Sequence, residues 1–393
     1  MPSLHTLLGA LGWFFLIPVL CGSAFYLLCL AAVLCFCRHR SRPAGTQGQE
    51  LPAVTVLKPV YGLEKDLEEN LRSTCQQDYP EYEVVLSAQR ADDPAIPLML
   101  KIQQEFGPGR VTVAIENQRA GTNGKINNLL GGIAQAQHQV IVISDSDVRL
   151  RPDYLRTIVA GLSKPDVGCV STLYKAAGAN AWFEKMELLT LNADLIPNII
   201  FAYMTGAAKP CLGASIALRR STLEDIGGLA SLADYLVEDY ELGCRIVNSG
   251  RKLAILPYFV DTILDLKTPR EWWDHQVYWD QNHRSARPYG YFSAIIVRAV
   301  PFALLYALLR LFDNTGLLVL AATVALRLMV SALILGVGLR DREGLRYVPL
   351  LPIRDLIALW SFILAYTKRT TVWRGTRFTL TKDGRLIAPE PPQ

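Results

Sequence analysis

Two aspartates separated by one residue are the sharpest chemical feature of this 393-residue sequence. Asp145 and Asp147 stand in the tripeptide Asp-Ser-Asp, directly after the apolar run 139–144. Carboxylates at this spacing, where the chain leaves a buried strand, can bind one hard cation such as Mg²⁺ or Mn²⁺ and leave positions for phosphate oxygens. Such a cation neutralises a diphosphate leaving group. The alternative is an ordinary solvated turn, because Asp and Ser are favoured in turns.

Two further acidic pairs also follow apolar runs. Asp92 and Asp93 precede Pro94, and the simpler interpretation of one of them is an N-cap of the helix that opens at the proline. The second pair, Glu238 and Asp239, stands at the start of a helical stretch. There a carboxylate either complements the helix dipole or acts as a general base that takes a proton from an attacking hydroxyl.

A glycine-containing segment offers a counter-charge to these acids. Residues 121–128 read GTNGKINN, and the helix start that follows the glycines presents backbone amides to anions. Lys125 is placed to lie against a diphosphate. The segment is not a P-loop, because the Gly-x4-Gly-Lys-Ser/Thr spacing is absent.

The elements that must position these residues alternate along the chain. Four short β-branched or apolar runs predict strands, at 53–59, 82–89, 110–115 and 139–144. Two stretches between them, 94–106 and 125–137, have helical spacing. This alternation predicts a doubly wound, mostly parallel α/β sheet, in which ligands bind beyond the carboxyl ends of the strands.

The composition separates a globular centre from apolar flanks. Hydrophobic residues make up 51% of the chain and charged residues 19%, but residues 7–37 and 291–366 hold much of the apolar share. The net charge of +4 is small against 40 basic and 36 acidic residues, which gives no case for a nucleic-acid partner. A globular domain between membrane segments is the simplest interpretation.

The N-terminal apolar run 7–37 carries no charge and exceeds the roughly 20 residues that span a bilayer. A signal peptide has its basic residues before the apolar run, whereas Arg38, His39, Arg40 and Arg42 follow it, so we expect an uncleaved anchor and a cytosolic domain after it.

Three C-terminal runs, 294–311, 317–339 and 350–366, are further candidates, and the last is short for a span. Arg298, Arg310 and Arg327 interrupt them and must face protein, water or the interface. The basic tail favours three full spans over four. The apolar stretch 188–204 is either a buried core helix or a segment that enters the membrane.

Taken in order, the motifs resemble a family 2-type glycosyltransferase of the GT-A fold, and more closely the ceramide glucosyltransferase family with its bacterial hopanoid-pathway relatives. The matching stretches are Leu57-Lys58-Pro59 with Gly62, residues 78–84 (DYPEYEV), 92–96 (DDPAI), 125–129 (KINNL), Asp145-Ser146, Glu238-Asp239-Tyr240 and Trp373-Arg374-Gly375.

This resemblance implies a role for each acidic motif. Asp92, Asp93, Lys125 and Asp145 would bind the nucleotide-sugar, and Asp145 with Asp147 would hold Mn²⁺ or Mg²⁺. Asp239 would be the catalytic base of an inverting displacement, which gives a β-glycoside from a UDP-α-sugar. The chain 211–220 would line the acceptor side.

One stretch departs from the family pattern Gln-x-x-Arg-Trp. Here His275 takes the Gln position and Tyr278 the Arg position, while Trp279 is retained. Arg284 or Arg287, just downstream, either replaces the missing cation on the diphosphate and acceptor side or contacts lipid headgroups. The aromatic residues around Trp279 favour a helix that lies in the membrane interface.

The resemblance therefore implies transfer of glucose or N-acetylglucosamine from a UDP-sugar to a hydroxyl of a membrane lipid, most closely ceramide. A hopanoid polyol is the alternative acceptor. Two alternative functions have less support: a processive polysaccharide synthase and a non-catalytic lipid-binding relative. We expect a bacterial inner-membrane location, or Golgi or ER in a eukaryote.

The expected organisation has five parts. They are an anchor (1–42), a GT-A catalytic domain (50–268), an interfacial helix with an Arg-rich segment (269–290), a C-terminal membrane region (291–366) and a cytosolic tail (367–393).

Overall fold

The structure, a computed structural model, describes residues 4–38, 51–117, 119–209, 211–367, 370–373, 376–381 and 385–387. The chain forms two compact units. The sheet unit comprises His39–Gly178, Gly206–Asp265 and Trp373–Gln393, and the helical unit comprises Met1–Arg38, Ala179–Thr205 and Leu266–Val372. The basic residues 39–42 and 368–369, and Arg374-Gly375 of the last motif, lie outside the described residues.

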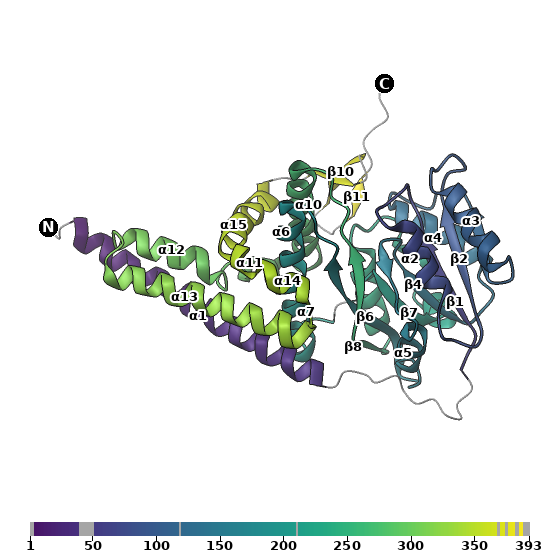
Figure 1. Cartoon of the computed structure of the whole chain (residues 1–393), viewed down its shortest axis with the longest axis horizontal. Coiled ribbons are helices and arrows are strands. Elements are labelled where there is room, and N and C mark those ends of the chain that lie inside the picture. Colours follow the sequence, from purple (N-terminus) through teal and green to yellow (C-terminus); the bar gives the residue numbers. More distant parts are fainter. Residues whose placement is uncertain are drawn as a thin grey trace, which may run out of the picture. The chain divides into compact units, whose positions relative to one another are not determined.

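An eight-stranded sheet forms the centre of the sheet unit, in the order β3-β2-β1-β4-β7-β6-β8-β5 (Figure 1). Its strands are β1 (Val54–Pro59), β2 (Tyr82–Ala88), β3 (Val111–Ile115), β4 (Val140–Ser144), β5 (Val148–Arg149), β6 (Val167–Ala177), β7 (Ser215–Arg219) and β8 (Lys252–Ile263). The first four are parallel neighbours, and β6 is parallel to β8. Only β7 and β5 run antiparallel to their neighbours. The predicted mostly parallel α/β sheet is confirmed.

The sequence explains why these strands lie in the middle of the unit. Every residue of β1, β2 and β4 is buried, as expected for β-branched runs that are covered on both faces of a parallel sheet. The helices of the unit are α2 (Leu67–Cys75), α3 (Ile96–Phe106), α4 (Gly124–Gln135), α5 (Tyr154–Ala160), α8 (Arg220–Asp225) and α9 (Glu238–Asn248). The apolar face of α4, with Ile126 and Leu129, is buried.

The helical unit contains the apolar segments. Its helices are α1 (Leu4–Arg38), α6 (Trp182–Thr190), α7 (Ile196–Met204), α10 (Pro269–Ala286), α11 (Pro288–Ser293), α12 (Ala299–Leu309), α13 (Asn314–Leu333), α14 (Arg342–Tyr347) and α15 (Leu351–Thr367). Two π-helical segments, η1 (Leu191–Leu195) and η3 (Ile334–Leu339), continue α6 and α13. A turn at Asp313 and Asn314 separates α12 from α13, where Asp313 caps α13.

Within the part of the chain that the structure describes, three helical stretches are long and apolar enough to cross a membrane: Gly12–Arg38, Asn314–Leu339 and Arg342–Thr367. The run 350–366 was predicted to be short for a span, and this prediction is wrong; the short helix is α12, within the run 294–311. The run that begins near residue 350 is extended by α14 and a 3₁₀ turn into a 26-residue stretch, whereas α12 has only 11 residues. At 1.5 Å per residue α12 rises roughly 17 Å, about half of a bilayer core.

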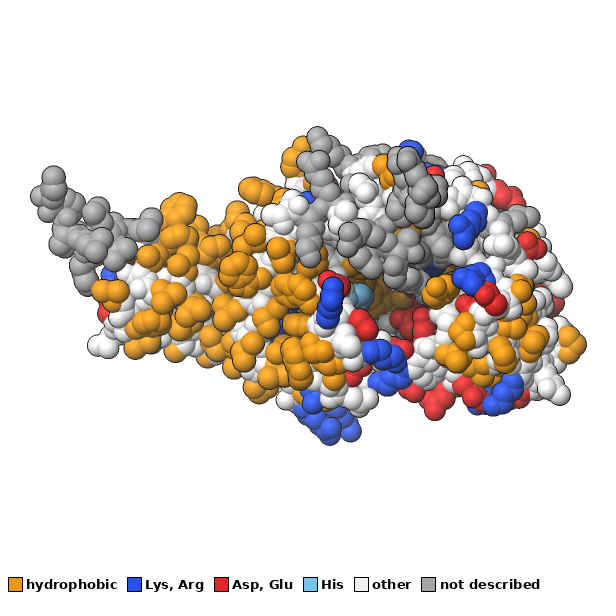
Figure 2. Space-filling view, turned by 90° about the horizontal axis from the view of Figure 1, so that it is seen from above, with side chains coloured by type: hydrophobic (Ala, Val, Ile, Leu, Met, Phe, Trp, Pro, Cys, Tyr) orange, Lys and Arg blue, Asp and Glu red, His pale blue; other side chains and the backbone are white. Residues whose placement is uncertain are grey.

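The surface of the helical unit agrees with this assignment. On the face that Figure 2 shows, hydrophobic side chains cover the bundle that α1, α12 and α13 form. In the helices of this bundle, Trp13, Phe14 and Leu318 are each more than half exposed. Large apolar patches of this kind mark contact with a partner or a membrane.

The apolar stretch around residues 188–204 belongs to the helical unit and packs on α1. Phe201 stacks edge-on against Phe25, and Tyr203 does so against Phe36. This stretch therefore packs against a helix that is long and apolar enough to cross a membrane.

Candidate active site

Lys125 connects three segments at the carboxyl edge of the sheet. Its ammonium nitrogen lies 2.7 Å from Oδ1 of Asp145, 3.3 Å from Oε1 of Glu238 and 3.3 Å from the carbonyl oxygen of Gly213. Burial disfavours the charged form, but the carboxylates of Asp145 and Glu238 outweigh it, so the pKa of Lys125 is raised. The lysine is therefore a fixed positive charge between the carboxyl end of β4 and the start of α9.

The start of α4 is held in place by its N-cap. The side-chain oxygen of Asn123 accepts hydrogen bonds from the amides of Lys125 and Ile126, as N-cap residues do. Its amide nitrogen donates to the carbonyl of Tyr235 at 2.9 Å and to Oε2 of Glu238 at 3.1 Å. Asn123 thus aligns α4 with the segment that leads into α9.

Asp239 is fixed by two backbone amides. The N–H of Gly213 donates to Oδ2 at 2.6 Å, and the N–H of Tyr240 donates to Oδ1 at 2.7 Å. Burial, together with the neighbouring charge of Glu238, raises the pKa of Asp239 to about 7. A carboxylate with a pKa near neutrality is suited to general-base catalysis, because it can accept a proton and is still largely ionised above pH 7.

A buried lysine, Lys58, fixes the backbone at Asp145 by hydrogen bonds. Nζ of Lys58 in β1 donates to the carbonyl oxygens of Asp145 at 2.8 Å and Val148 at 3.0 Å. Lys58 is fully buried, and this burial lowers its pKa to about 8. The lysine of the Leu57-Lys58-Pro59 motif is therefore a support for the β4–β5 connection.

The side chains around Asp145 and Asp147 decide whether the predicted cation site has suitable ligands. Burial, with the charges of Asp145 and Glu64 as the next causes, raises the pKa of Asp147 to about 7. Glu64 also accepts a hydrogen bond from the hydroxyl of Ser146 at 2.6 Å. Among the described residues, no three His, Cys, Asp or Glu side chains are gathered as a metal cluster. Two carboxylates fit a magnesium-like ion that takes its other ligands from substrate phosphate and water.

Asp93 and Asp92 have different surroundings. Buried Asp93 accepts hydrogen bonds from the amide of Gly62 at 3.0 and 3.1 Å and from that of Ala95 at 2.9 Å. It therefore binds the start of α3, as the expected cap does, and it also fixes the loop after β1 through Gly62. Gly62 has a φ of 69°, a conformation that favours glycine. Asp92 is exposed and pairs with Arg90.

The four residues predicted around the departure from the family pattern, His275, Trp279, Arg284 and Arg287, lie in the helical unit, whereas 211–220 belong to the sheet unit. His275 Nδ1 is 2.8 Å from Oε1 of the fully buried Glu187, and Trp279 Nε1 donates to His275 Nε2 at 3.1 Å. Since Nε2 accepts, Nδ1 carries the proton and donates to Glu187. Gln276 also donates to Glu187. The departure from the family pattern thus places a histidine and a glutamine on one buried carboxylate.

The two downstream arginines lie at the end of α10. The guanidinium of Arg284 lies 5.6 Å from the ring centroid of Tyr366, a cation–π contact with α15. Arg287 follows α10 and ends it, its amide donating to the carbonyl of His283 at 2.9 Å. Both residues belong to the helical unit.

Within the sheet unit, Lys125, Asp145 and Asp239 are brought together through Gly213 and Glu238. Gly213, Asn123 and Glu64 were not predicted as site residues, and Glu238 was considered only as one of the pair that could supply a general base. Glu238 was signalled by its adjacency to Asp239. Nothing in the local spacing marks Gly213, which acts through its backbone.

A likeness to a solved structure agrees with this fold. A mannosyltransferase from Pyrobaculum calidifontis, in complex with GDP-Man and Mn²⁺, is similar with a TM-score of 0.52 and 19% sequence identity. The likeness covers 91% of this chain and 99% of that one. The sheet unit is thus a GT-A-like glycosyltransferase fold.

The sequence comparison is more specific. The profile of Glycosyl transferase family 21 matches residues 14–386, and the chain belongs to this family. The resemblance drawn from the ordered motifs is thereby confirmed.

Three curated relatives differ in how much of their length they share with this chain. Ceramide glucosyltransferase 3 of Caenorhabditis elegans is 24% identical over 98% of this chain and 83% of its own length. Ceramide glucosyltransferase 1 of the same organism is 27% identical over 55% and 46%. The probable glycosyltransferase YdaM of Bacillus subtilis is 24% identical over 60% and 56%.

Proposed function

We propose that this glycosyltransferase moves a sugar, glucose or N-acetylglucosamine, from a UDP-sugar to a hydroxyl of a membrane lipid, with ceramide as the first acceptor to test. The observation that carries the chemistry is Asp239, a fixed carboxylate with a pKa near 7 beside the Lys125 cluster. The acceptor class is supported by the relatives named ceramide glucosyltransferases and by three helices able to cross a membrane.

The reaction follows from the positions of the charges. Asp239 takes the proton of the acceptor hydroxyl as that oxygen attacks the anomeric carbon, and the bond from that carbon to the UDP oxygen breaks. The electron pair of that bond leaves with the diphosphate. Attack from the face opposite the leaving group inverts the anomeric centre, so a UDP-α-sugar yields a β-glycoside.

The leaving group needs positive charge, and Lys125 supplies one permanent charge next to Asp145. Asp145 and Asp147 would hold a divalent cation, which supplies the remaining neutralisation of the diphosphate when it is bound. Asp93, through the loop at Gly62, shapes the nucleotide side of the site, with Asp92 beside it. These roles fit a site that already concentrates negative charge at Asp145, Asp147 and Glu64.

The proposed location is a membrane with the sheet unit in the cytosol, since Arg38 and the basic residues after it follow the first span. This orientation gives the active site access to cytosolic UDP-sugars. The bacterial inner membrane, or Golgi or ER membranes, would serve equally.

The decisive experiment incubates membranes that contain the protein with labelled UDP-glucose or UDP-N-acetylglucosamine, Mn²⁺ or Mg²⁺, and either ceramide or a hopanoid polyol. We expect a labelled glycolipid with a β-linkage. Asp239→Asn should abolish it, whereas Asp225→Asn, an exposed aspartate paired with Arg251, should not. Polymer growth, or lipid binding without turnover of any donor, would contradict the proposal.

The cation requirement is tested separately. Removal of divalent ions with EDTA should stop turnover, and added Mn²⁺ should restore it. Asp147→Asn should raise the Mn²⁺ concentration needed for half-maximal rate by at least about tenfold, because loss of an outer-shell partner of a metal ligand alone costs about 10- to 100-fold in metal affinity. Full activity after exhaustive chelation would argue against the cation.

A further inference from the structure

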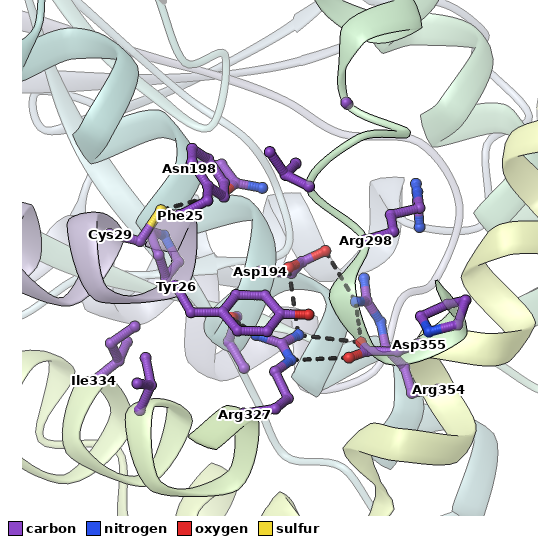
Figure 3. A pocket seen from close by; sticks show the side chains of 16 residues that line it. Phe25, Tyr26, Cys29, Asp194, Asn198, Arg298, Arg327, Ile334, Arg354 and Asp355 are labelled. Atoms are coloured by element: carbon purple, nitrogen blue, oxygen red, sulfur yellow. Dashed lines mark hydrogen bonds and ion pairs between the residues drawn. The ribbon is translucent and has the colours of Figure 1, made fainter. Parts of the chain in front are cut away.

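A charged cavity lies inside the helical unit, among the membrane helices. Its wall includes three arginines, Arg298, Arg327 and Arg354, and two aspartates, Asp194 and Asp355 (Figure 3). The cavity volume is about 80 Å³. This is several times the roughly 10–15 Å³ that one water molecule requires.

Two of the arginines are neutralised by the aspartates. Arg327 donates to Asp355 at 2.9 and 3.1 Å and approaches Asp194 at 3.4 Å. Arg354 donates to Asp194 at 2.9 Å and to Asp355 at 3.1 Å. The four groups form a closed network in which two positive charges meet two negative ones.

Arg298 is left over. Its Nε is buried without a hydrogen-bond partner, and its charge acts on Asp194 without forming an ion pair within 4.0 Å among the described residues. Its guanidinium lies over the ring of Phe362, 5.0 Å from the centroid. Figure 3 shows Arg298 beside the network with no dashed line joining it. With three arginines and two aspartates, the wall carries one positive charge in excess.

The depth of the cavity makes this charge costly. Tyr26, Arg327 and Asp355, all in the wall, each stand near the midpoint of one of the three candidate spans. At 1.5 Å per residue, Tyr26 and Arg327 are roughly 18–21 Å from either end of their spans. An ionised side chain at such depth is rare and points to a bound partner or a pathway.

The backbone around the cavity is also unusual. Asp194 stands in the π-helical segment η1, and Ile334 of the wall begins the π-helical segment η3. Such segments are uncommon and frequently occur at functional sites. Whereas Arg327, Arg354 and Asp355 are nearly inaccessible, the Asp194 side chain is 32% exposed, so the network opens toward the cavity.

Besides the charged residues, the wall contains the polar side chains of Tyr26, Cys29 and Asn198 and a set of apolar ones that suits hydrocarbon. Its apolar members come from α1, α7, α13 and the segment before and within α12, namely Phe25, Pro197, Ala294, Val297, Pro301 and Val330. A guanidinium whose Nε has no partner, beside apolar side chains at mid-bundle, matches an amphiphile with an anionic head.

We propose that this cavity binds the phosphate of an anionic phospholipid, with Arg298 as the group that pairs with it and the apolar wall in contact with the acyl chains. The site is distinct from the residues assigned to sugar transfer. The inference does not rest on the proposed function, because binding is measured without any sugar donor.

The test uses the full-length protein purified in detergent and titrated with phosphatidylglycerol or with phosphatidylcholine of the same acyl chains, with bound lipid counted by native mass spectrometry. We expect phosphatidylglycerol to bind at least tenfold more tightly. Arg298→Gln should remove this preference, and Arg298→Lys should restore most of it. Asp239→Asn should bind the lipid like the wild type.

The matched control is Arg310→Gln at the other end of α12, where the guanidinium is already paired with Asp313 at 2.5 Å. It should leave the preference unchanged. Equal binding of both lipids, or an unaltered preference in Arg298→Gln, would overturn the proposal. So would displacement of the lipid by millimolar inorganic phosphate, which would indicate a soluble ligand, or by ceramide, which would indicate a neutral one.

Discussion

The ammonium nitrogen of Lys125 lies 2.7 Å from Oδ1 of Asp145, so a fixed cation already touches one of the two carboxylates assigned to the diphosphate. Replacing Lys125 with Gln removes that charge and leaves Asp145 and Glu238 without their shared partner. We expect kcat/KM for the UDP-sugar to fall by about 100-fold, the order found when one electrostatic contact to a developing charge is lost.

Steady-state rates at saturating lipid measure this effect. The control is Lys252→Gln, a surface lysine paired with Asp166, which should keep nearly full activity. If Lys125→Gln stayed within about threefold of wild type, the lysine would be a structural element only.

The pH dependence of the rate should report Asp239. Its pKa is raised to about 7 by burial and by the charge of Glu238, and only the deprotonated form can take the acceptor's proton. The value of kcat/KM should therefore be constant above pH 8 and fall as the pH decreases through about 7. Glu238→Gln removes a negative charge that raises this pKa, so the acidic limb should move to lower pH.

Rate profiles between pH 5 and 9 check this shift. Glu241→Gln, on the same helix and paired with Arg245 at 2.7 Å, is the control and should leave the limb where it is. An acidic limb that stays in place in Glu238→Gln would show that another group controls the profile.

Substitution of the neighbouring residues Asp92 and Asp93 should change the stability of the protein by clearly different amounts. Asp93→Ala deletes the acceptor of the Gly62 and Ala95 amides, and we expect a loss of about 1–2 kcal/mol together with a higher KM for the donor. Asp92→Ala removes only an exposed pair with Arg90 and should leave the melting temperature unchanged. Thermal melting of both variants in detergent, with donor titrations, compares them; equal effects would contradict the assignment.

The local patterns predicted the first half of the sheet well. The four β-branched runs became β1 to β4 with boundaries within about two residues, because buried parallel strands have a continuous apolar signature. The long strands β6 and β8 were not predicted. Strand β8 contains Pro257 and Asp261, and its pairing with β6 spans more than 80 residues of sequence, so no local spacing reveals it.

The site divides in the same way. Asp145, Asp239 and Lys125 were recognisable because each follows or opens an element that the patterns predicted. The contacts with their shared partners, Gly213 and Glu238, depend on where β7 and α9 return to the sheet. That position is set by the tertiary fold and not by local sequence. The arginines of the membrane segments were expected to face protein or water, but their aspartate at position 194 lies more than 100 residues away in sequence.

The departure at His275 gives a direct test of what that residue does. Its Nδ1–H donates to the fully buried carboxylate of Glu187, a role that a glutamine side chain at the same position can also fill. His275→Gln, the residue of the family pattern, should therefore keep the melting temperature and most of the activity. His275→Ala leaves Glu187 with one donor fewer and should destabilise the chain by about 1–3 kcal/mol. Melting curves and glycosyl-transfer rates of the two variants decide the matter: if His275→Gln lost activity while retaining its stability, the imidazole itself would have a chemical role.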